Sequence, residues 1–248
     1  MAAGPQTGVI TDEKLTGAAG QDNSDPAVAA EFLAAEASGA GRSGAARDAV
    51  SRQGTGDDRD GDQPLAWYGD SAYGTGDLRA AIGKAGQQAV IKPKPVQPAV
   101  EGGFTVDDFT VDAAAGTVTC PAGLTRQVTA RNAVIFGAAC RDCPLREKCT
   151  TAKDGRTLHL HEHDGLLRAA RADWAADPGL RKDYMTHRPN VERAIAQVVT
   201  WRGRRLKLRY RGQAPNHAWL KRRTAAVNLR NLLGRGLARQ DGTWMLAT

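Results

Sequence analysis

Residues 65–92 carry the pattern that most restricts the fold, because two short apolar runs flank one helical segment. Residues 65–68 predict a buried strand, residues 77–84 a helix that starts after Thr75, and residues 88–92 a second strand ended by Pro93. Strands joined through a helix pair in parallel, so we expect a strand, helix, strand unit of an α/β fold. Asp70 directly follows the first strand, where α/β folds place their chemistry.

The rest of the chain divides by composition around this unit. Residues 1–37 predict a short strand at Val9 and Ile10 and then a helix. Residues 38–64 hold six Gly and no aromatic residue, which is typical of a flexible linker. Residues 93–165 contain Pro, hairpin-like segments and all four cysteines, as an insertion would. Residues 166–237 predict helices at 166–174, 189–201 and 214–233, followed by a tail at 238–248. The last helix is expected to bury Ala218, Ala225, Leu229 and Leu232.

Charge is distributed unevenly along the 248 residues. The net charge is +7, but residues 181–239 hold 16 Lys and Arg against two acids, Asp183 and Glu192. This block favours a polyanion such as nucleic acid over a merely solvated face. Its candidate DNA contacts are Arg188, Arg202, Arg204, Arg205, Lys207 and Arg209, with Tyr210 and Trp219 among the cations.

Targeting and redox signals point to the cell interior. The sequence contains no apolar run long enough for a membrane helix, and its first residues form no export signal. We therefore expect a cytoplasmic protein, associated with the nucleoid through DNA and not with a membrane. In that compartment four cysteines argue against a disulfide framework.

Two acidic residues are candidates for chemistry, and each has an ordinary structural alternative. Asp70 lies in WYGDSAYG, where it either caps a turn or holds a divalent cation. Glu192 lies at the edge of a helical stripe formed by Val191, Ile195 and Val198, one turn after Arg188. It either forms a surface ion pair with that arginine or supplies an acid to a phosphoryl-transfer site.

The cysteines also leave two interpretations open. Their spacing is C-x19-C-x2-C-x5-C, and the CRDC pair suits half of a tetrahedral zinc site. Zinc would be bound by Cys120, Cys140, Cys143 and Cys149, with His159, His161 or His163 able to replace one of them. The other interpretation is reduced cysteines that pack a small insertion.

Taken in order, these motifs resemble the DDE transposases of bacterial insertion sequences that carry a cysteine-bearing insertion. The resemblance rests on WYGDSAYGTGDLR, CRDCPLREKC, HRPNVERAIAQVVTWRGRR and NLRNLL, and it runs from about Val9 to Leu237. It implies an RNase H-like α/β fold, incomplete at the N-terminus, with a small β-rich insertion and a helical C-terminus. The implied function is Mg²⁺- or Mn²⁺-dependent cleavage and transfer of DNA strands at transposon ends, by a homo-oligomer when active.

The resemblance also assigns roles to single residues. Asp70 corresponds to the second catalytic acid and Glu192 to the third, four residues after Arg188. Tyr184 is the candidate for the tyrosine that precedes this arginine, although its spacing is one residue longer. The basic residue farther along has three candidates, Arg202, Arg204 and Arg205.

The first catalytic acid has no counterpart under this resemblance. Its strand lies shortly upstream of the segment that PQTGVITDEKLTGA resembles, so Asp12, Asp22 and Asp25 do not inherit the role. The resemblance thus implies the C-terminal part of a transposase, without the first acid or the upstream helical DNA-binding region.

Two alternatives accompany this hypothesis. One is a catalytically inactive DNA-binding remnant or regulator of transposition. The other is a zinc-stapled nucleic-acid-binding module unrelated to transposition, which we would favour if Asp70 and Glu192 lay far apart.

Overall fold

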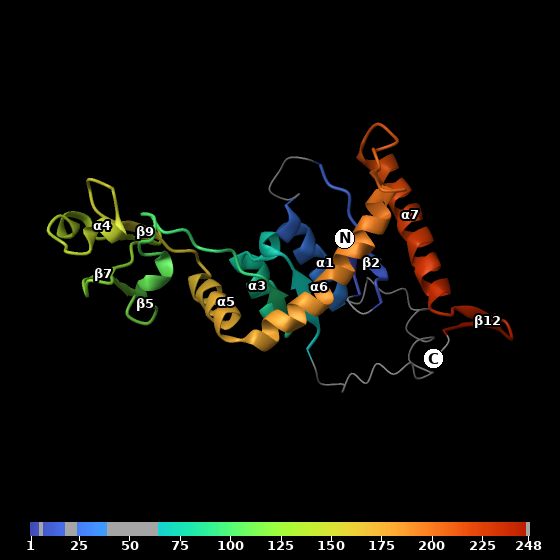
Figure 1. Ribbon diagram of the computed structural model, residues 1–248, viewed down its shortest axis with the longest axis horizontal. Helices are drawn as coiled ribbons and strands as arrows, with labels where there is room; N and C mark the ends of the chain where they lie inside the picture. Colours follow the sequence, from blue (N-terminus) through green and yellow to red (C-terminus); the bar gives the residue numbers. More distant parts are fainter. Residues whose placement is uncertain (5–6, 18–23, 39–63, 247–248) are drawn as a thin grey trace. The chain divides into compact units, whose positions relative to one another are not determined.

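The computed structural model describes residues 1–4, 7–17, 24–38 and 64–246 (Figure 1). The chain forms two compact units, one made of residues 1–92 and 176–248 and the other of residues 93–175. Nearly all of the linker predicted at 38–64 lies outside the described residues, as does Asp22. No helix within the described residues is long and apolar enough to span a membrane.

The first unit combines short strands with long helices. Its strands are β1 (Ala2–Ala3), β2 (Ile10–Asp12), β3 (Ala66–Gly69), β4 (Gln88–Ile91), β10 (Thr200–Trp201), β11 (Arg204–Arg205), β12 (Ala238–Gln240) and β13 (Thr243–Met245). Its helices are α1 (Asp25–Ser38), α3 (Gly76–Lys84), α6 (Pro178–Val199) and α7 (Gln213–Gly234), with a 3₁₀ helix at Ser71–Tyr73.

The strand, helix, strand unit is confirmed. β3 and β4 pair in parallel, with Ala66 opposite Gln88 and Gly69 opposite Ile91. The connecting helix α3 begins where predicted, because the Thr75 hydroxyl caps it by accepting the Leu78 N–H at 3.4 Å. Its apolar face packs against α1 in a core of buried residues: Ala29, Leu33, Leu78, Ile82 and Ile91.

The sheets are smaller than the resemblance leads one to expect. β1 and β2 form one antiparallel pair, and β3 and β4 form a separate parallel pair. Among the described strands these two pairs are not joined into a single sheet. Helix α6 packs against β1, β3 and β4, so one helix backs both pairs. The structure is therefore a mixed α/β arrangement, and an RNase H-like fold remains an expectation from the resemblance.

Helix α6 begins earlier in the chain than predicted. The expectation that Pro189 lies in the first turn is wrong, because the helix begins at Pro178 and Pro189 lies inside it. The start signal is Asp177 followed by Pro178: the Asp177 carboxylate accepts the Gly179 N–H at 2.7 Å, and proline suits the first helical position. Val191 and Val198 are buried as expected.

Helix α7 has its predicted extent but buries a different face. Its buried residues are Asn216, Leu220, Thr224 and Val227, whereas Ala218, Ala225 and Leu229 are exposed. Asn216 is 2% exposed, and its amide makes four hydrogen bonds to the backbone of residues 209, 210 and 212. An apolar pattern cannot identify this face, because a buried Asn is stable only when such partners exist.

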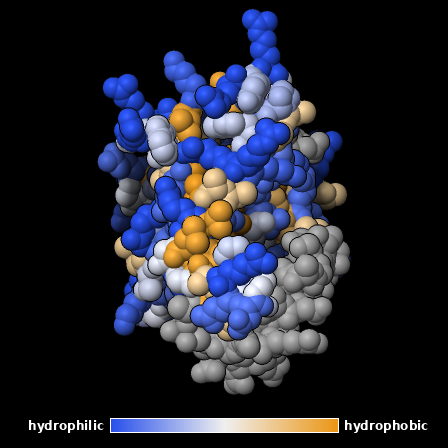
Figure 2. Space-filling view, turned by 90° about the vertical axis from the view of Figure 1, so that its right-hand side faces the viewer, coloured by the Kyte–Doolittle hydropathy of each residue, from blue (hydrophilic) through white to orange (hydrophobic). Residues whose placement is uncertain are grey.

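Figure 2 shows a face of the molecule on which hydrophobic residues interrupt a mostly hydrophilic surface.

The second unit is the cysteine-bearing insertion together with one helix. Its strands are β5 (Thr110–Asp112), β6 (Thr117–Thr119), β7 (Thr125–Gln127), β8 (Ala133–Ile135) and β9 (Thr157–His159), and its helices are α4 (Arg146–Cys149) and α5 (Asp164–Ala176). β5, β6 and β7 form an antiparallel sheet, and β8 pairs with β9.

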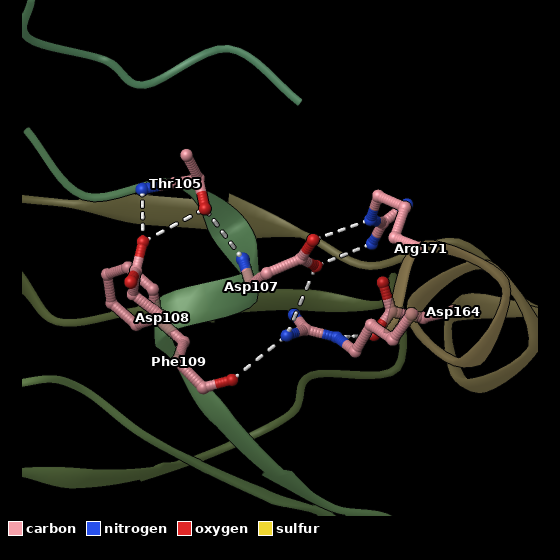
Figure 3. Close-up of polar contacts among 7 residues, drawn as sticks. Thr105, Asp107, Asp108, Phe109, Asp164 and Arg171 are labelled. Atoms are coloured by element: carbon pink, nitrogen blue, oxygen red, sulfur yellow. Dashed lines mark hydrogen bonds and ion pairs between the residues drawn. The ribbon is translucent and has the colours of Figure 1, made fainter. Parts of the chain in front are cut away.

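Ion pairs hold α5 to the insertion (Figure 3). The Arg171 guanidinium binds both oxygens of Asp107, at 2.5 and 2.6 Å, and Arg168 donates to the carbonyl of Phe109 at 3.0 Å. Asp107 lies in a 3₁₀ helix at Val106–Asp108 that Thr105 caps. The second unit therefore includes α5 in its own network of contacts.

The bonded Asn216 gives a prediction for stability. Asn216→Ala removes the partners of four partly buried backbone groups and should destabilise the chain by about 2 kcal/mol or more. Urea unfolding followed by circular dichroism measures the change. The exposed Arg222→Ala on the same helix serves as control and should stay within about 0.5 kcal/mol. Equal stability of the two variants would show that the Asn216 bonds contribute nothing.

Candidate functional site

Asp70 lies where β3 ends, and its two oxygens have different partners. Oδ1 accepts the Ala72 N–H at 2.8 Å and so caps the 3₁₀ helix Ser71–Tyr73. Oδ2 lies 3.4 Å from Nη2 of Arg188 on α6. The chain turns closely here, since a Cβ at Gly69 would meet the Tyr73 Cβ at 3.0 Å. Asp70 is thus a capping residue whose second oxygen is directed to α6.

Arg188 joins both candidate acids. Its Nη2 also lies 2.5 Å from Oε1 of Glu192, one helical turn farther along α6. Asp70 Oδ2 and Glu192 Oε1 both contact Nη2 of Arg188. The distance between these two oxygens therefore cannot exceed the sum of their distances to that nitrogen. That limit is within the ~8 Å expected for two carboxylates that share a metal site. The structure therefore brings Asp70 and Glu192 together, which disfavours the unrelated nucleic-acid-binding module.

Burial differs sharply across this cluster. The Arg188 side chain is 11% exposed, whereas Asp70 is 48% and Glu192 57% exposed. The cation therefore lies beneath two carboxylates that are open to solvent. Burial raises the pKa of the neighbouring Tyr73, and the negative charges of Asp25 and Asp70 raise it further. Arg188 opposes that rise.

A second link between β3 and α6 was missed by the sequence reasoning. The Tyr68 hydroxyl donates to Asp183 at 3.0 Å, and the Tyr68 ring lies 5.1 Å from that of His187. His187 Nε2 lies 3.4 Å from Asp183 Oδ1. The i, i+4 spacing of Asp183 and His187 was the available signal, but only the fold shows that Tyr68 faces them.

The residues predicted to contact DNA are exposed, apart from Arg188. β10 and β11 form a hairpin whose turn contains Arg202 and Gly203, both at positive φ. All five other candidate DNA contacts are exposed: Arg202, Arg204, Arg205, Lys207 and Arg209. Arg188 instead lies between the two acids, so the structure shows it as a partner of carboxylates.

A groove lies beside this hairpin. Its volume is about 320 Å³, and it is lined by Trp201, Leu206, Lys207, Arg209, Trp219 and Arg223. The Arg223 guanidinium donates to carbonyls at the end of α6, including that of Thr200 at 2.6 Å, and it also lies 5.9 Å from the Trp201 ring. Arg223 thus fixes the hairpin to α6 and α7.

The four cysteines are free thiols, and all of them line one small cavity in the second unit. Among the described residues, however, no three His, Cys, Asp or Glu side chains are close enough together to hold one metal ion. Neither the cysteines nor the pair of Asp70 and Glu192 forms such a group among the described residues.

The contact of Tyr68 with Asp183 predicts a pH dependence. Burial, together with the hydrogen bond to Asp183 and its charge, raises the pKa of Tyr68 to about 12. Between the ordinary pKa of about 10 and this value, the folded chain keeps a proton that the unfolded chain has lost, so stability should fall as pH rises through this window. Asp183→Asn should lower the pKa only in part, because burial remains.

Absorbance titration of tyrosinate in the native chain measures this shift. Asp173→Asn, an exposed acid on α5, is the control and should leave the titration unchanged. Identical titrations for Asp183→Asn and the wild type would contradict the assigned cause.

Comparison with known protein families gives a match that begins at Thr119. Residues 119–233 match a protein family described as "Transposase DDE domain". The match includes the cysteines, Arg188, Glu192 and the basic hairpin, whereas Asp70 lies before it. A search of curated proteins and a search of solved structures found no match. The predicted resemblance to DDE transposases is confirmed for this segment.

Proposed function

We propose that this chain acts in DNA transposition and that Asp70 and Glu192 are acids of its catalytic site. The observation that carries the proposal is their shared contact with Nη2 of Arg188, although Asp70 and Arg188 lie 118 residues apart in sequence. The family match implies DNA as substrate and divalent ions as cofactors.

The chemistry of the two acids fits Mg²⁺ or Mn²⁺. Both ions prefer carboxylate oxygens, and Asp70 and Glu192 present oxygens that solvent can reach. When bound, such an ion activates the attacking oxygen and stabilises the departing one. Asp70 and Glu192 would hold it, while β3 and α6 fix their positions.

Without a bound metal ion, Arg188 holds the two carboxylates close together. Two carboxylates so close together repel each other, and the guanidinium between them offsets that repulsion. A divalent ion would compete with Arg188 for the same two oxygens. We propose that the arginine then turns from its carboxylates toward a DNA phosphate, for which its planar guanidinium is suited.

The acid set is incomplete within the described residues, where no third ligand joins the pair. Asp12 lies on β2 and Asp25 begins α1, while Asp22 lies outside the described residues. Two-metal phosphoryl transfer depends on an acid shared between the ions. We therefore expect weak binding of one ion, and DNA binding with little cleavage.

Metal binding gives the direct test. Mn²⁺ titration followed by electron paramagnetic resonance should show one weak site, and Asp70→Asn or Glu192→Gln should each weaken it at least about tenfold. Arg188→Gln should retain binding, because both ligand oxygens remain. Asp173→Asn is the matched control. Mn²⁺ affinity that is the same in all four variants would exclude this pair as the metal site.

Cleavage separates an active enzyme from the alternative of an inactive DNA-binding remnant or regulator. The chain is incubated with Mn²⁺ and duplex DNA carrying the ends of its own element. Weak or absent nicking agrees with the incomplete acid set. Efficient nicking that Asp70→Asn abolishes would contradict it.

The exposed cations of the hairpin and of the groove beside it are proposed to bind DNA phosphates. Replacing Lys207 and Arg209 by Ala should weaken duplex binding and reduce the slope of log K against log salt by about 2, at ~0.9 per phosphate contact. Fluorescence anisotropy over a salt series measures the slope. Arg126→Ala with Arg131→Ala, exposed cations of the second unit, is the charge-matched control. A slope equal to that of the wild type would place the DNA elsewhere.

A further inference from the structure

The cysteine cavity of the second unit is separate from the proposed catalytic site. It is lined by all four cysteines, by three phenylalanines and by two arginines, besides smaller contacts: Cys120, Cys140, Cys143, Cys149, Phe104, Phe109, Phe136, Arg146 and Arg156. The cysteines reach it from four places: after β6, at the end of the 3₁₀ helix Gly137–Cys140, in the following turn, and at the end of α4. Four thiols from separate segments thus meet around one space.

The cavity has room for a single ion. Its volume is about 20 Å³, which accommodates roughly one water-sized particle. A water molecule needs two to four polar partners, and an apolar lining with thiols supplies few of them. Four thiol sulfurs are instead the donor set that zinc binds tetrahedrally. The size and the chemistry of the space both favour a soft metal ion.

The surroundings suit the charge of such a centre. Zn²⁺ with four thiolates carries a net charge of −2, and two cationic residues, Arg146 and Arg156, are among those that line the cavity. The Arg156 N–H donates to the Cys140 sulfur at 3.5 Å, a contact of the kind that stabilises a metal-bound thiolate.

The same arginines hold the cysteine-bearing turns in place. Arg146 donates to the carbonyls of Cys140 at 3.2 Å and Ala152 at 3.0 Å, and Arg156 donates to that of Cys149 at 3.4 Å.

The fully buried core of the insertion is small. Its strands have three residues each, and its core contains six buried residues: Phe109, Val118, Val134, Phe136, Cys149 and Leu158. Small units with such cores commonly rely on a metal or on disulfides, and here the thiols are free.

We propose that the second unit binds one structural zinc ion through Cys120, Cys140, Cys143 and Cys149. As the side chains lie, no three described ligands are close enough together for one ion, so the cysteines must turn inward about their single side-chain torsion. None of His159, His161 and His163 is among the described residues that line the cavity, so an all-cysteine site is favoured. The site is independent of Asp70 and Glu192, and its failure would leave the proposed function untouched.

Elemental analysis tests the proposal. The full chain, purified without a chelating column, should contain about one zinc ion, and Cys143→Ser should lose about nine tenths of it. Ala139→Ser, an exposed change next to Cys140, is the matched control and should retain the metal. A wild-type zinc content near zero, or full zinc content in Cys143→Ser, would overturn the proposal.

Cobalt substitution covers the case in which Cys143→Ser does not fold. Wild-type chain stripped of metal and titrated with Co²⁺ should show the charge-transfer absorbance of cobalt thiolates, saturating at about one ion per chain. Absence of that absorbance would refute thiolate ligation.

Discussion

The contact of Arg188 with two carboxylates is the interaction on which the rest of the proposed site depends. Asp70 reaches it from the end of β3, and Glu192 reaches it from the next turn of α6. A second contact, between Tyr68 and Asp183, joins the same strand to the same helix. With two links so close together, the orientation of β3 on α6 is fixed where the acids lie. A largely buried cation beneath exposed acids can hold them together until a divalent ion takes its place.

Local signals in the sequence were sufficient for part of this arrangement. The strand, helix, strand unit at 65–92 was predictable, because its apolar runs and the Thr75 cap agree with one another. The extents of α5 and α7 followed from similar patterns. The start of α6 was missed because Pro189 resembles a start signal, whereas Asp177 with Pro178 supplies the actual one. Pattern alone does not decide between two prolines that are eleven residues apart.

The features that could not be predicted from the sequence depend on tertiary contacts. The buried face of α7 contains Asn216, which is stable there only because the backbone of residues 209–212 supplies its hydrogen bonds. The meeting of Asp70 with Arg188, and of Tyr68 with Asp183, requires the packing of a strand on a distant helix. The resemblance paired Asp70 with Glu192, but only the fold shows Arg188 between them. The spacing of the cysteines suggested a metal site. Only the fold shows that all four cysteines line one cavity.

We propose above all that Asp70 and Glu192 form one divalent-ion site and that the bound ion displaces Arg188. Anomalous diffraction from crystals of the chain soaked in Mn²⁺ tests it most directly. We expect one manganese peak bonded to oxygens of both carboxylates, with the Arg188 guanidinium moved away from them. A peak bonded to only one of the two acids, or Mn²⁺ bound elsewhere while Arg188 keeps both contacts, would contradict it.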